Sequence, residues 1–182
     1  MKKFGNNCSL IEPPVPQPRE PLCMGSGPFR PNVAALILRR GEKGGFEILA
    51  GERVDSPGAW QWPQGGLEPG ESPEVGLNRE LAEEIGVTKP KVRYRFPFLL
   101  RYRFPISLGP KFAPNLGQDQ QYFIVTLDEG DPPNLDHAET EEFSSLTWLP
   151  LEASSFSTVW FKQPTYRHAV GHAVEVLPRL AL

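Results

Sequence analysis

One segment, GGLEPGESPEVGLNRELAEEIGV from Gly65 to Val87, constrains the fold of this chain more than any other. It carries Glu80, Glu83 and Glu84 three and four residues apart, within a stretch of helical apolar spacing. On a helix, that spacing places all three carboxylates on one face. Like charges at these separations cost an isolated helix about 0.2 to 0.5 kcal/mol per pair. We therefore expect a positive partner between them, and a hard divalent cation is the natural candidate.

The flanking residues predict a complete helix with one buried face. Ser72 is a suitable N-cap residue, and Pro73 fits the first turn, where a missing N–H group costs nothing. Gly86 can adopt the left-handed conformation in which helices often end. Upstream, Gly65 and Gly66 open a loop whose backbone N–H groups, together with the helix N-terminus, can approach an anion. The predicted core-facing stripe consists of Val75, Leu77, Leu81, Ala82 and Ile85.

As a whole, the segment resembles the Nudix box, G-x5-E-x7-R-E-U-x-E-E-x-G-U, in which U is an aliphatic residue. A solvated acidic helix face is the alternative, and matches at fixed offsets along the whole motif weigh against it. The resemblance implies an α/β (α+β) Nudix fold, with a mixed β-sheet sandwiched between α-helices. The matching residues are Gly65, Glu71, Arg79, Glu80, Leu81, Glu83, Glu84, Gly86 and Val87.

The glutamates suit the hydrolysis of a phosphoanhydride, which needs neutralised phosphoryl oxygens and an aligned water molecule. Mg²⁺ held by the box glutamates and the substrate phosphates would supply both, and Mn²⁺ is the alternative ion. Arg79 cannot share the ligand face, so we expect it to pair with Glu71 and hold the loop against the helix. The resemblance implies that Glu142 acts as a metal ligand or as the base. The implied metal-binding set is Gly65, Glu80, Glu83, Glu84 and Glu142.

Short matches outside the box resemble the bacterial RNA pyrophosphohydrolase branch of the family, which also contains asymmetric diadenosine tetraphosphate hydrolases. The resemblance runs from about Phe29 to about Arg167 and departs at Ile106 to Leu116. Any substrate contact that relatives make from that stretch is therefore in doubt here. The matching stretches are Phe29 to Val33, Trp60 to Gln64, Gly117 to Phe123, Glu142-Phe143, Trp148, Phe161-Lys162 and Tyr166-Arg167.

This branch implies two substrates, a 5′-triphosphorylated RNA or a nucleotide such as diadenosine tetraphosphate. Arg30, Arg53 and Lys162 would contact the phosphates, and Phe161, together with Arg53, would flank a base. The plain alternatives are surface charges for the two arginines, a core aromatic for Phe161, and one member of a solvated acidic run for Glu142. A non-catalytic Nudix-fold binding module is a further hypothesis, against which the intact box argues.

Length and charge limit the remaining possibilities. With 182 residues and a net charge of −3, we expect one domain without a global basic field. No apolar run approaches membrane-spanning length, and no hydrophobic region follows the basic start of the chain, so we expect a cytoplasmic protein. Cys8 and Cys23 are then expected to be unpaired thiols.

Residues 1–28 are rich in proline and lack apolar periodicity, which is typical of a tail or arm. We therefore divide the chain into this arm and a Nudix hydrolase domain at 29–182. The arm either forms a loosely packed extension or docks on the body or on the second subunit of a homodimer. Because no predicted metal ligand lies in it, we expect removal of residues 1–27 to leave catalysis intact.

The remaining elements follow from period and composition. A hairpin is predicted from Val33–Leu38 and Phe46–Ala50. Apolar residues at helical spacing predict a helix between Pro164 and Pro178. The repeat RYRFP, which begins at Arg93 and again at Arg101, is interpreted either as two half-buried strands or as a nucleic-acid surface. Further strands are predicted at Lys91–Phe96, Leu99–Phe104, Gln121–Leu127 and Leu146–Leu149.

Overall fold

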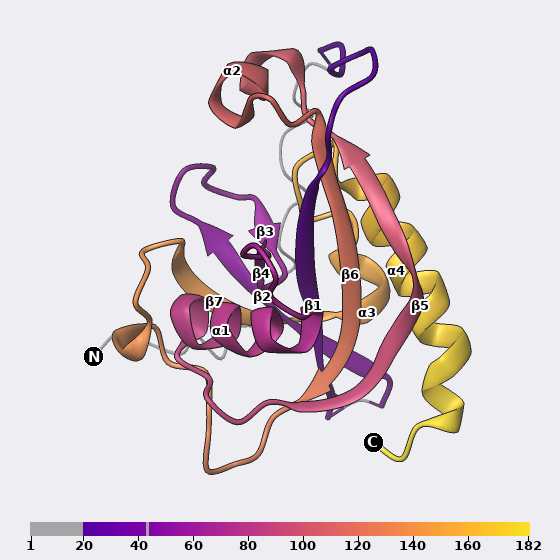
Figure 1. The fold of residues 1–182 in the computed structure, drawn as a ribbon. Helices are drawn as coiled ribbons and strands as arrows, with labels where there is room; N and C mark the ends of the chain where they lie inside the picture. Colours follow the sequence, from indigo (N-terminus) through magenta and orange to yellow (C-terminus); the bar gives the residue numbers. More distant parts are fainter. Residues whose placement is uncertain (1–19, 43) are drawn as a thin grey trace.

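A mixed β-sheet runs through the centre of the computed structural model, which describes residues 20–42 and 44–182 (Figure 1). The expectations for residues 1–19, including Cys8, lie outside the described residues, and Cys23 forms no disulfide within them. The strands are β1 (Arg30–Arg40), β2 (Phe46–Arg53), β3 (Trp60–Gln61), β4 (Gln64–Gly66), β5 (Lys91–Arg103), β6 (Gly117–Thr126) and β7 (Phe143–Pro150). The helices are α1 (Pro73–Ile85), α2 (Gly109–Phe112), α3 (Leu151–Ser154) and α4 (Gln163–Val176), with 3₁₀ turns η1 (Ile106–Leu108), η2 (Leu135–His137) and η3 (Leu177–Arg179).

The sheet has the order β3-β2-β1-β6-β5, with β4 paired to β1 and β7 paired to β2. β1 and β6 are parallel, and the other pairs are antiparallel, so the expected mixed sheet is confirmed. β1 changes partner along its length. Its first half faces β4, with Asn32 opposite Gly66, and its end faces β2, with Leu38 opposite Ile48.

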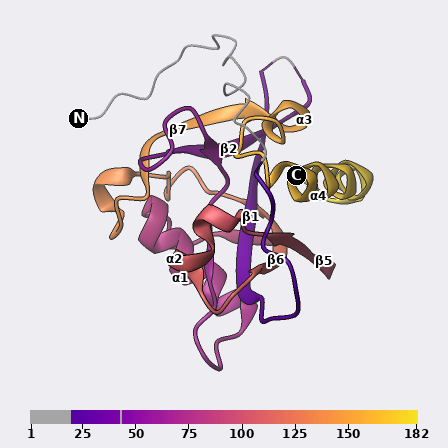
Figure 2. The ribbon, with the colours of Figure 1, turned by 90° about the horizontal axis from the view of Figure 1, so that it is seen from above.

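Helices α1 and α4 cover opposite faces of the sheet (Figure 2). Alternation along β1 sends Val33, Ala35 and Ile37 into the core under α1, while Ala34, Leu36 and Leu38 belong to the core on the α4 side. Within the described residues, no helix combines the length and apolarity needed to cross a membrane.

α1 begins and ends where the sequence predicts. The Ser72 side chain accepts a hydrogen bond from the Val75 N–H group, and Gly86 takes a left-handed φ of 67°. The Gly86 N–H group donates to the carbonyl of Ala82, which closes the last turn. The buried face of the helix includes Leu77, Leu81 and Ile85, so the three glutamates are carried by an element with fixed ends and a fixed core face.

The prediction of two strands across the RYRFP repeat is wrong, because Lys91–Arg103 forms one continuous strand. Pro97 interrupts the apolar pattern, but it is exposed where the register with β6 shifts between Arg95 and Leu99. β5 is an edge strand, so a residue without an N–H group is tolerated there. Tyr102 is buried and Arg101 is exposed, as expected for the half-buried interpretation of the repeat.

Two chain segments that the sequence left without structure lie against each other at one end of the sheet. We call residues 105–116, which contain η1 and α2, the cap, and residues 20–28 the strap. The Ile106 N–H group donates to the Pro21 carbonyl at 3.0 Å, and the Leu116 N–H group donates to the Pro28 carbonyl at 2.9 Å. The described part of the arm, residues 20–28, is therefore docked on the domain. Proline carbonyls still accept hydrogen bonds although proline donates none.

Candidate active site

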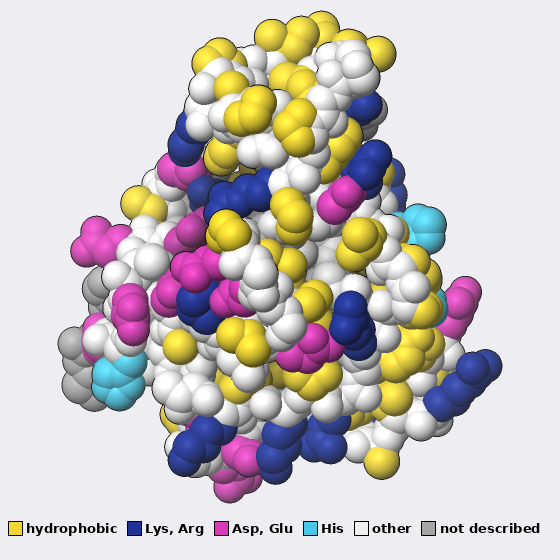
Figure 3. Space-filling view, in the orientation of Figure 1, with side chains coloured by type: hydrophobic (Ala, Val, Ile, Leu, Met, Phe, Trp, Pro, Cys, Tyr) yellow, Lys and Arg dark blue, Asp and Glu magenta, His cyan; other side chains and the backbone are white. Residues whose placement is uncertain are grey.

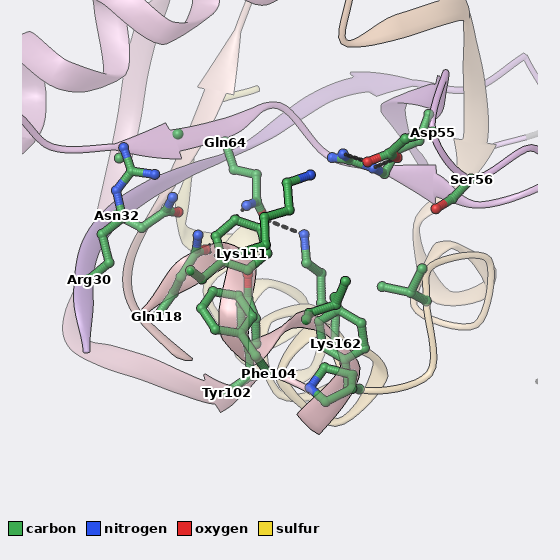
Figure 4. Close-up of a pocket in the computed structure, with 18 of the residues that line it drawn as sticks. Arg30, Asn32, Asp55, Ser56, Gln64, Tyr102, Phe104, Lys111, Gln118 and Lys162 are labelled. Carbon is green, nitrogen blue, oxygen red and sulfur yellow. Dashed lines mark hydrogen bonds and ion pairs between the residues drawn. The ribbon is translucent and has the colours of Figure 1, made fainter. Parts of the chain in front are cut away.

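A cavity of about 560 Å³ opens beneath the cap, at the end of the sheet where β1, β4 and β6 meet (Figure 4). It is lined from both sides of β4. Carboxylates come from α1 and from the residue before β7, and cations and amides come from β1, β2, β4, β6 and the segment before α4. In Figure 3, apolar side chains gather over the cap, and acidic and basic side chains meet below it.

The acidic wall consists of Glu80, Glu84 and Glu142. Glu84 is 2% exposed, and its carboxylate accepts a hydrogen bond from the Gln64 N–H group at 3.0 Å. Burial raises the pKa of Glu84 well above its usual range, and the charges of Glu142 and Glu80 add to the rise. Burial also raises the pKa of Glu80, against the opposing effect of Arg79. At Glu80 and Glu84, the effect of burial therefore outweighs that of the neighbouring cations.

Arg79 ties the glycine-rich loop to α1. Its guanidinium donates to both carboxylate oxygens of Glu71 at 2.9 Å and to the Gly66 carbonyl at 2.8 Å. The expected pair is thus present, and with a backbone hydrogen bond it lowers the pKa of Glu71 to about 2. The same guanidinium reaches Glu80 at 2.8 Å and Glu83 at 3.1 Å. Arg79 itself is therefore a positive partner between two of the acids.

Two adjacent glycines in β4 make room for side chains on its opposite faces. A Cβ atom on Gly65 would lie 1.7 Å from the Glu80 carboxyl carbon, and one on Gly66 would lie 2.0 Å from Nη2 of Arg30. Both distances are far below contact. The carboxylate on one face and the guanidinium on the other are therefore separated only by backbone.

The donor set suits a hard divalent cation, because the carboxylates of Glu80, Glu84 and Glu142 face one cavity and repel one another. Within residues 20–42 and 44–182, no three such groups stand close enough together to enclose an ion. Glu80 is held by Arg79, and Glu142 is held by Arg53 at 2.5 Å. Glu83 does not line the cavity. Ion binding therefore requires these side chains to exchange partners.

The predicted phosphate-binding cations line the same cavity as these carboxylates. Arg30 is exposed beside Gly66, and Arg53 is fixed by Asp55 at 2.6 Å as well as by Glu142. Lys162 is 6% exposed, and its Nζ donates to Oε1 of Gln61 at 2.5 Å. Burial lowers the pKa of Lys162 to about 7, and the charge of Arg53 contributes.

The aromatic side chains form one continuous row at the cavity, in which Tyr102 and Phe104 lie edge to face with ring centroids 5.8 Å apart. Phe161 is half-buried, with its ring centroid 5.7 Å from that of Tyr102, so it is not a core aromatic. Phe104 and Phe112 stack with centroids 4.3 Å apart and rings inclined by 19°. All four line the cavity.

The sequence predictions missed a floor of amides and a hydroxyl, made by Asn32, Gln64, Gln118 and Tyr102. Gln64 donates from Nε2 to Oε1 of Gln118 at 3.3 Å, and the Tyr102 hydroxyl donates to the same oxygen at 2.6 Å. One signal was available. Gln118 and Gln120 alternate in phase with the core residues of the same strand, where an amide needs a partner.

Comparison with known proteins identifies the family. The NUDIX domain model matches residues 28–169. The protein belongs to the Nudix family. An RNA pyrophosphohydrolase of Sulfurovum sp. (strain NBC37-1) is 38% identical over 81% of this chain and 94% of its own length, and one of Helicobacter pylori (strain G27) is 37% identical over 79% and 92%.

Solved Nudix structures share the fold at lower identity. The E. coli dihydroneopterin triphosphate pyrophosphohydrolase aligns with a TM-score of 0.61 and 19% identity, over 81% of this chain and 97% of that one. A C. elegans Ap4A hydrolase binary complex aligns with a TM-score of 0.59 and 19% identity, over 80% and 98%. The Nudix architecture inferred from the box is therefore confirmed.

The cap gives this Nudix domain a wall that the sequence comparison left open. Ser107, Leu108, Lys111 and Phe112 line the cavity, although the stretch Ile106 to Leu116 lacked a trusted counterpart. Lys111 reaches over the cavity toward the side where Asp55 lies and helps to lower the pKa of that carboxyl, after the larger effect of Arg53 (Figure 4). Side chains of the cap can therefore contact a molecule bound in this cavity.

Proposed function

We propose that this protein removes pyrophosphate from the 5′ triphosphate end of RNA and leaves a 5′ monophosphate. The observation that carries the proposal is one cavity lined both by the box carboxylates Glu80 and Glu84 and by the cations Arg30 and Lys162. A chain of phosphates needs both kinds of group, carboxylates to hold a metal and cations to take the remaining charge. The names of the bacterial relatives support RNA as the substrate.

In this proposal, Arg30, Arg53 and Lys162 bind the triphosphate, and Phe161 stacks on a base. Arg53 must release Glu142 to do so, because the two are joined in the structure at 2.5 Å. The freed carboxylate of Glu142 then serves as a metal ligand or as the base that takes a proton from the attacking water. Substrate binding and the release of Glu142 are thereby coupled.

We propose a divalent cation as cofactor, with Mg²⁺ as the first choice and Mn²⁺ as an alternative. Glu80, Glu83, Glu84, Glu142 and the backbone of Gly65 would hold it. When bound, it would neutralise phosphoryl oxygens and activate water. We also propose the cytoplasm as the compartment, because the RNA substrate is made there.

Hydrolysis of a dinucleoside polyphosphate is the second candidate. The aromatic row favours it, since its two ends, Phe161 and Phe112, offer two places for a base. A dinucleotide carries a base at each end of its phosphates, as diadenosine tetraphosphate does.

Turnover of triphosphorylated RNA and of diadenosine tetraphosphate, each with Mg²⁺, tests the proposal. We expect RNA to have the larger kcat/KM, with pyrophosphate as product. Glu84→Gln should lower kcat by about 10² to 10⁴ while the melting temperature does not fall, because the buried carboxylate is replaced by a neutral group of the same shape. Wild-type turnover in this variant would contradict the proposed role.

Phe161→Ala separates stacking from packing. Base stacking is worth roughly 1 to 3 kcal/mol, so kcat/KM on triphosphorylated RNA should fall about 5- to 150-fold. A free nucleoside triphosphate has no second base and should lose much less. Equal losses on both substrates, or a large fall in melting temperature, would favour a packing role for Phe161.

A further inference from the structure

Asn32 has a buried amide nitrogen without a partner. The residue is 1% exposed, and its Oδ1 accepts a hydrogen bond from Nε2 of Gln120 at 2.9 Å. Among the residues that the structure describes, its Nδ2 has no hydrogen-bond partner, although Asn32 lines the cavity. A buried donor left unpaired costs about 1 to 3 kcal/mol, so such a group in a folded protein calls for a physical reason.

The orientation of this amide is determined by its neighbours. The ammonium of Lys162 has only hydrogens to offer, so the Gln64 atom that faces it at 3.4 Å must be the acceptor Oε1. That oxygen also faces Gln120 at 3.0 Å, so Gln120 must present its NH₂ group there. The same NH₂ group faces Asn32, which must therefore present Oδ1. Reversing Asn32 would bring two NH₂ groups together.

The opposite end of the chain of amides agrees with this orientation, because a tyrosine hydroxyl can donate to the remaining oxygen of Gln120. The Tyr122 hydroxyl donates to Oε1 of Gln120 at 2.6 Å, which leaves Nε2 of Gln120 for Asn32 and Gln64. Gln120 is completely buried and does not line the cavity. We call the hydrogen bonds that run from Lys162 through Gln64 and Gln120 to Asn32 the relay. The relay leaves Nδ2 of Asn32 without a partner in the part of the chain that the structure describes.

The surroundings of Asn32 favour a phosphate oxygen as the missing partner. Arg30 precedes it by two residues on the same face of β1, and the strand residue opposite is Gly66, over which the Arg30 guanidinium lies. Figure 4 shows Arg30, Asn32 and Gln118 on one side of the cavity, and Gln64 between them and Lys162. A neutral donor between two cations matches an anionic oxygen.

We propose that Asn32 is a substrate-binding residue whose Nδ2 donates a hydrogen bond to a non-bridging oxygen of the polyphosphate, and that Gln120 and Gln64 are positioning residues that hold it in this orientation. The proposal rests on the proposed function and adds a specific phosphate contact to it. The unpaired donor is satisfied when substrate is bound.

Binding of inorganic pyrophosphate, measured by calorimetry on the full-length protein, tests the contact without requiring catalysis. Asn32→Leu removes the donor, and Asn32→Asp replaces it with an oxygen while it keeps the acceptor for Gln120. Each should weaken binding about 10- to 150-fold, the loss expected for one hydrogen bond to a charged oxygen. Asn134→Asp is the control for charge, because Asn134 caps η2 away from the cavity and an aspartate can do the same. It should bind within about twofold of wild type.

Gln120→Met tests the relay, because it keeps the volume but removes the NH₂ group that orients Asn32. We expect pyrophosphate binding to weaken at least fivefold, and the double variant with Asn32→Leu to bind no more weakly than Asn32→Leu alone. A merely structural role would lower the melting temperature of Gln120→Met and leave the binding losses additive. Wild-type affinity in both Asn32 variants would overturn the phosphate contact.

The two proposals can fail separately. If pyrophosphate binding depends on Asn32 but triphosphorylated RNA is not hydrolysed, the proposed function fails and the anion contact stands. If RNA is hydrolysed with unchanged KM in the Asn32 variants, the assignment of Asn32 fails and the proposed function stands.

Discussion

At the level of single residues, the cavity combines charged side chains with neutral amides. Glu142 and Lys162 are distant from the box in sequence, yet they line the same cavity as Glu84. Family resemblance indicated both, because a matching motif distinguishes them from the charged residues of an ordinary solvated surface. Asn32 and Gln118 were missed because an amide inside a strand has no distinctive spacing. Their importance depends on hydrogen bonds that only the fold reveals.

The buried ammonium of Lys162 predicts a characteristic pH dependence. Its pKa of about 7 lies below that of an exposed lysine, so the cation that binds phosphate is present below pH 7 and is lost above it. Lys162→Arg keeps its charge throughout. The ratio of wild-type to variant kcat/KM on triphosphorylated RNA, set to one at pH 6, should therefore fall about tenfold by pH 8. A ratio that does not change with pH would show that the phosphate does not depend on this charge.

At the level of elements, local signals predicted α1 closely and β5 poorly. The helix carries its own start and stop residues, Ser72 and Gly86, and both act within a few residues of themselves. The continuity of β5 depends on β6 and on an edge position that tolerates Pro97, neither of which is local information. The cap was missed for the same reason, because its hydrogen-bond partners in the strap are some 80 residues away in the chain.

The link between Glu71 and Arg79 should contribute to stability in a defined pH range. The folded pKa of Glu71, about 2, lies below its usual value of 4.5, so the contribution is complete above about pH 4.5 and is lost as the pH falls toward 2. Glu71→Gln should lower the melting temperature at pH 7 by about 3 to 6 °C and flatten its dependence on pH between 4.5 and 2.

Arg79→Lys is the matched control for charge. A lysine keeps the charge but cannot reach both oxygens of Glu71 in a fork, so we expect it to lose most of the same stability. Full stability in Arg79→Lys would show that only charge matters here.

At the level of the whole molecule, the site is assembled from distant parts of the chain. The sheet brings the start of β1 beside β4 and β6, α1 supplies carboxylates from one face, and the segment before α4 supplies Lys162 from the other. The cap covers this junction and is held by the strap (Figure 1). Resemblance to the Nudix box indicated the architecture of the domain. It did not indicate that the strap holds the cap, because the strap sequence has no periodicity to interpret.

Two truncations test whether the strap belongs to the functional unit. Removal of residues 1–19 should leave kcat/KM within about threefold, because no predicted ligand lies there. Removal of residues 1–27 should raise KM about tenfold with a smaller change in kcat, since it deletes the partners of Phe104, Ile106 and Arg103. This reverses the expectation from sequence. Equal kinetics for the two forms would restore that expectation, and size-exclusion chromatography of both would test whether the chain forms a homodimer.

The paired glycines of β4 have a consequence for how this protein can vary. At Gly65 and Gly66, only the backbone separates the Glu80 carboxylate from the Arg30 guanidinium. Neither glycine can therefore gain a methyl group without displacing one of these charged groups. In a library that samples every amino acid at every position, functional clones should keep glycine at these two neighbouring positions. The same restriction should hold when clones are selected for activity alone, because a Cβ atom at either position would collide with Glu80 or Arg30.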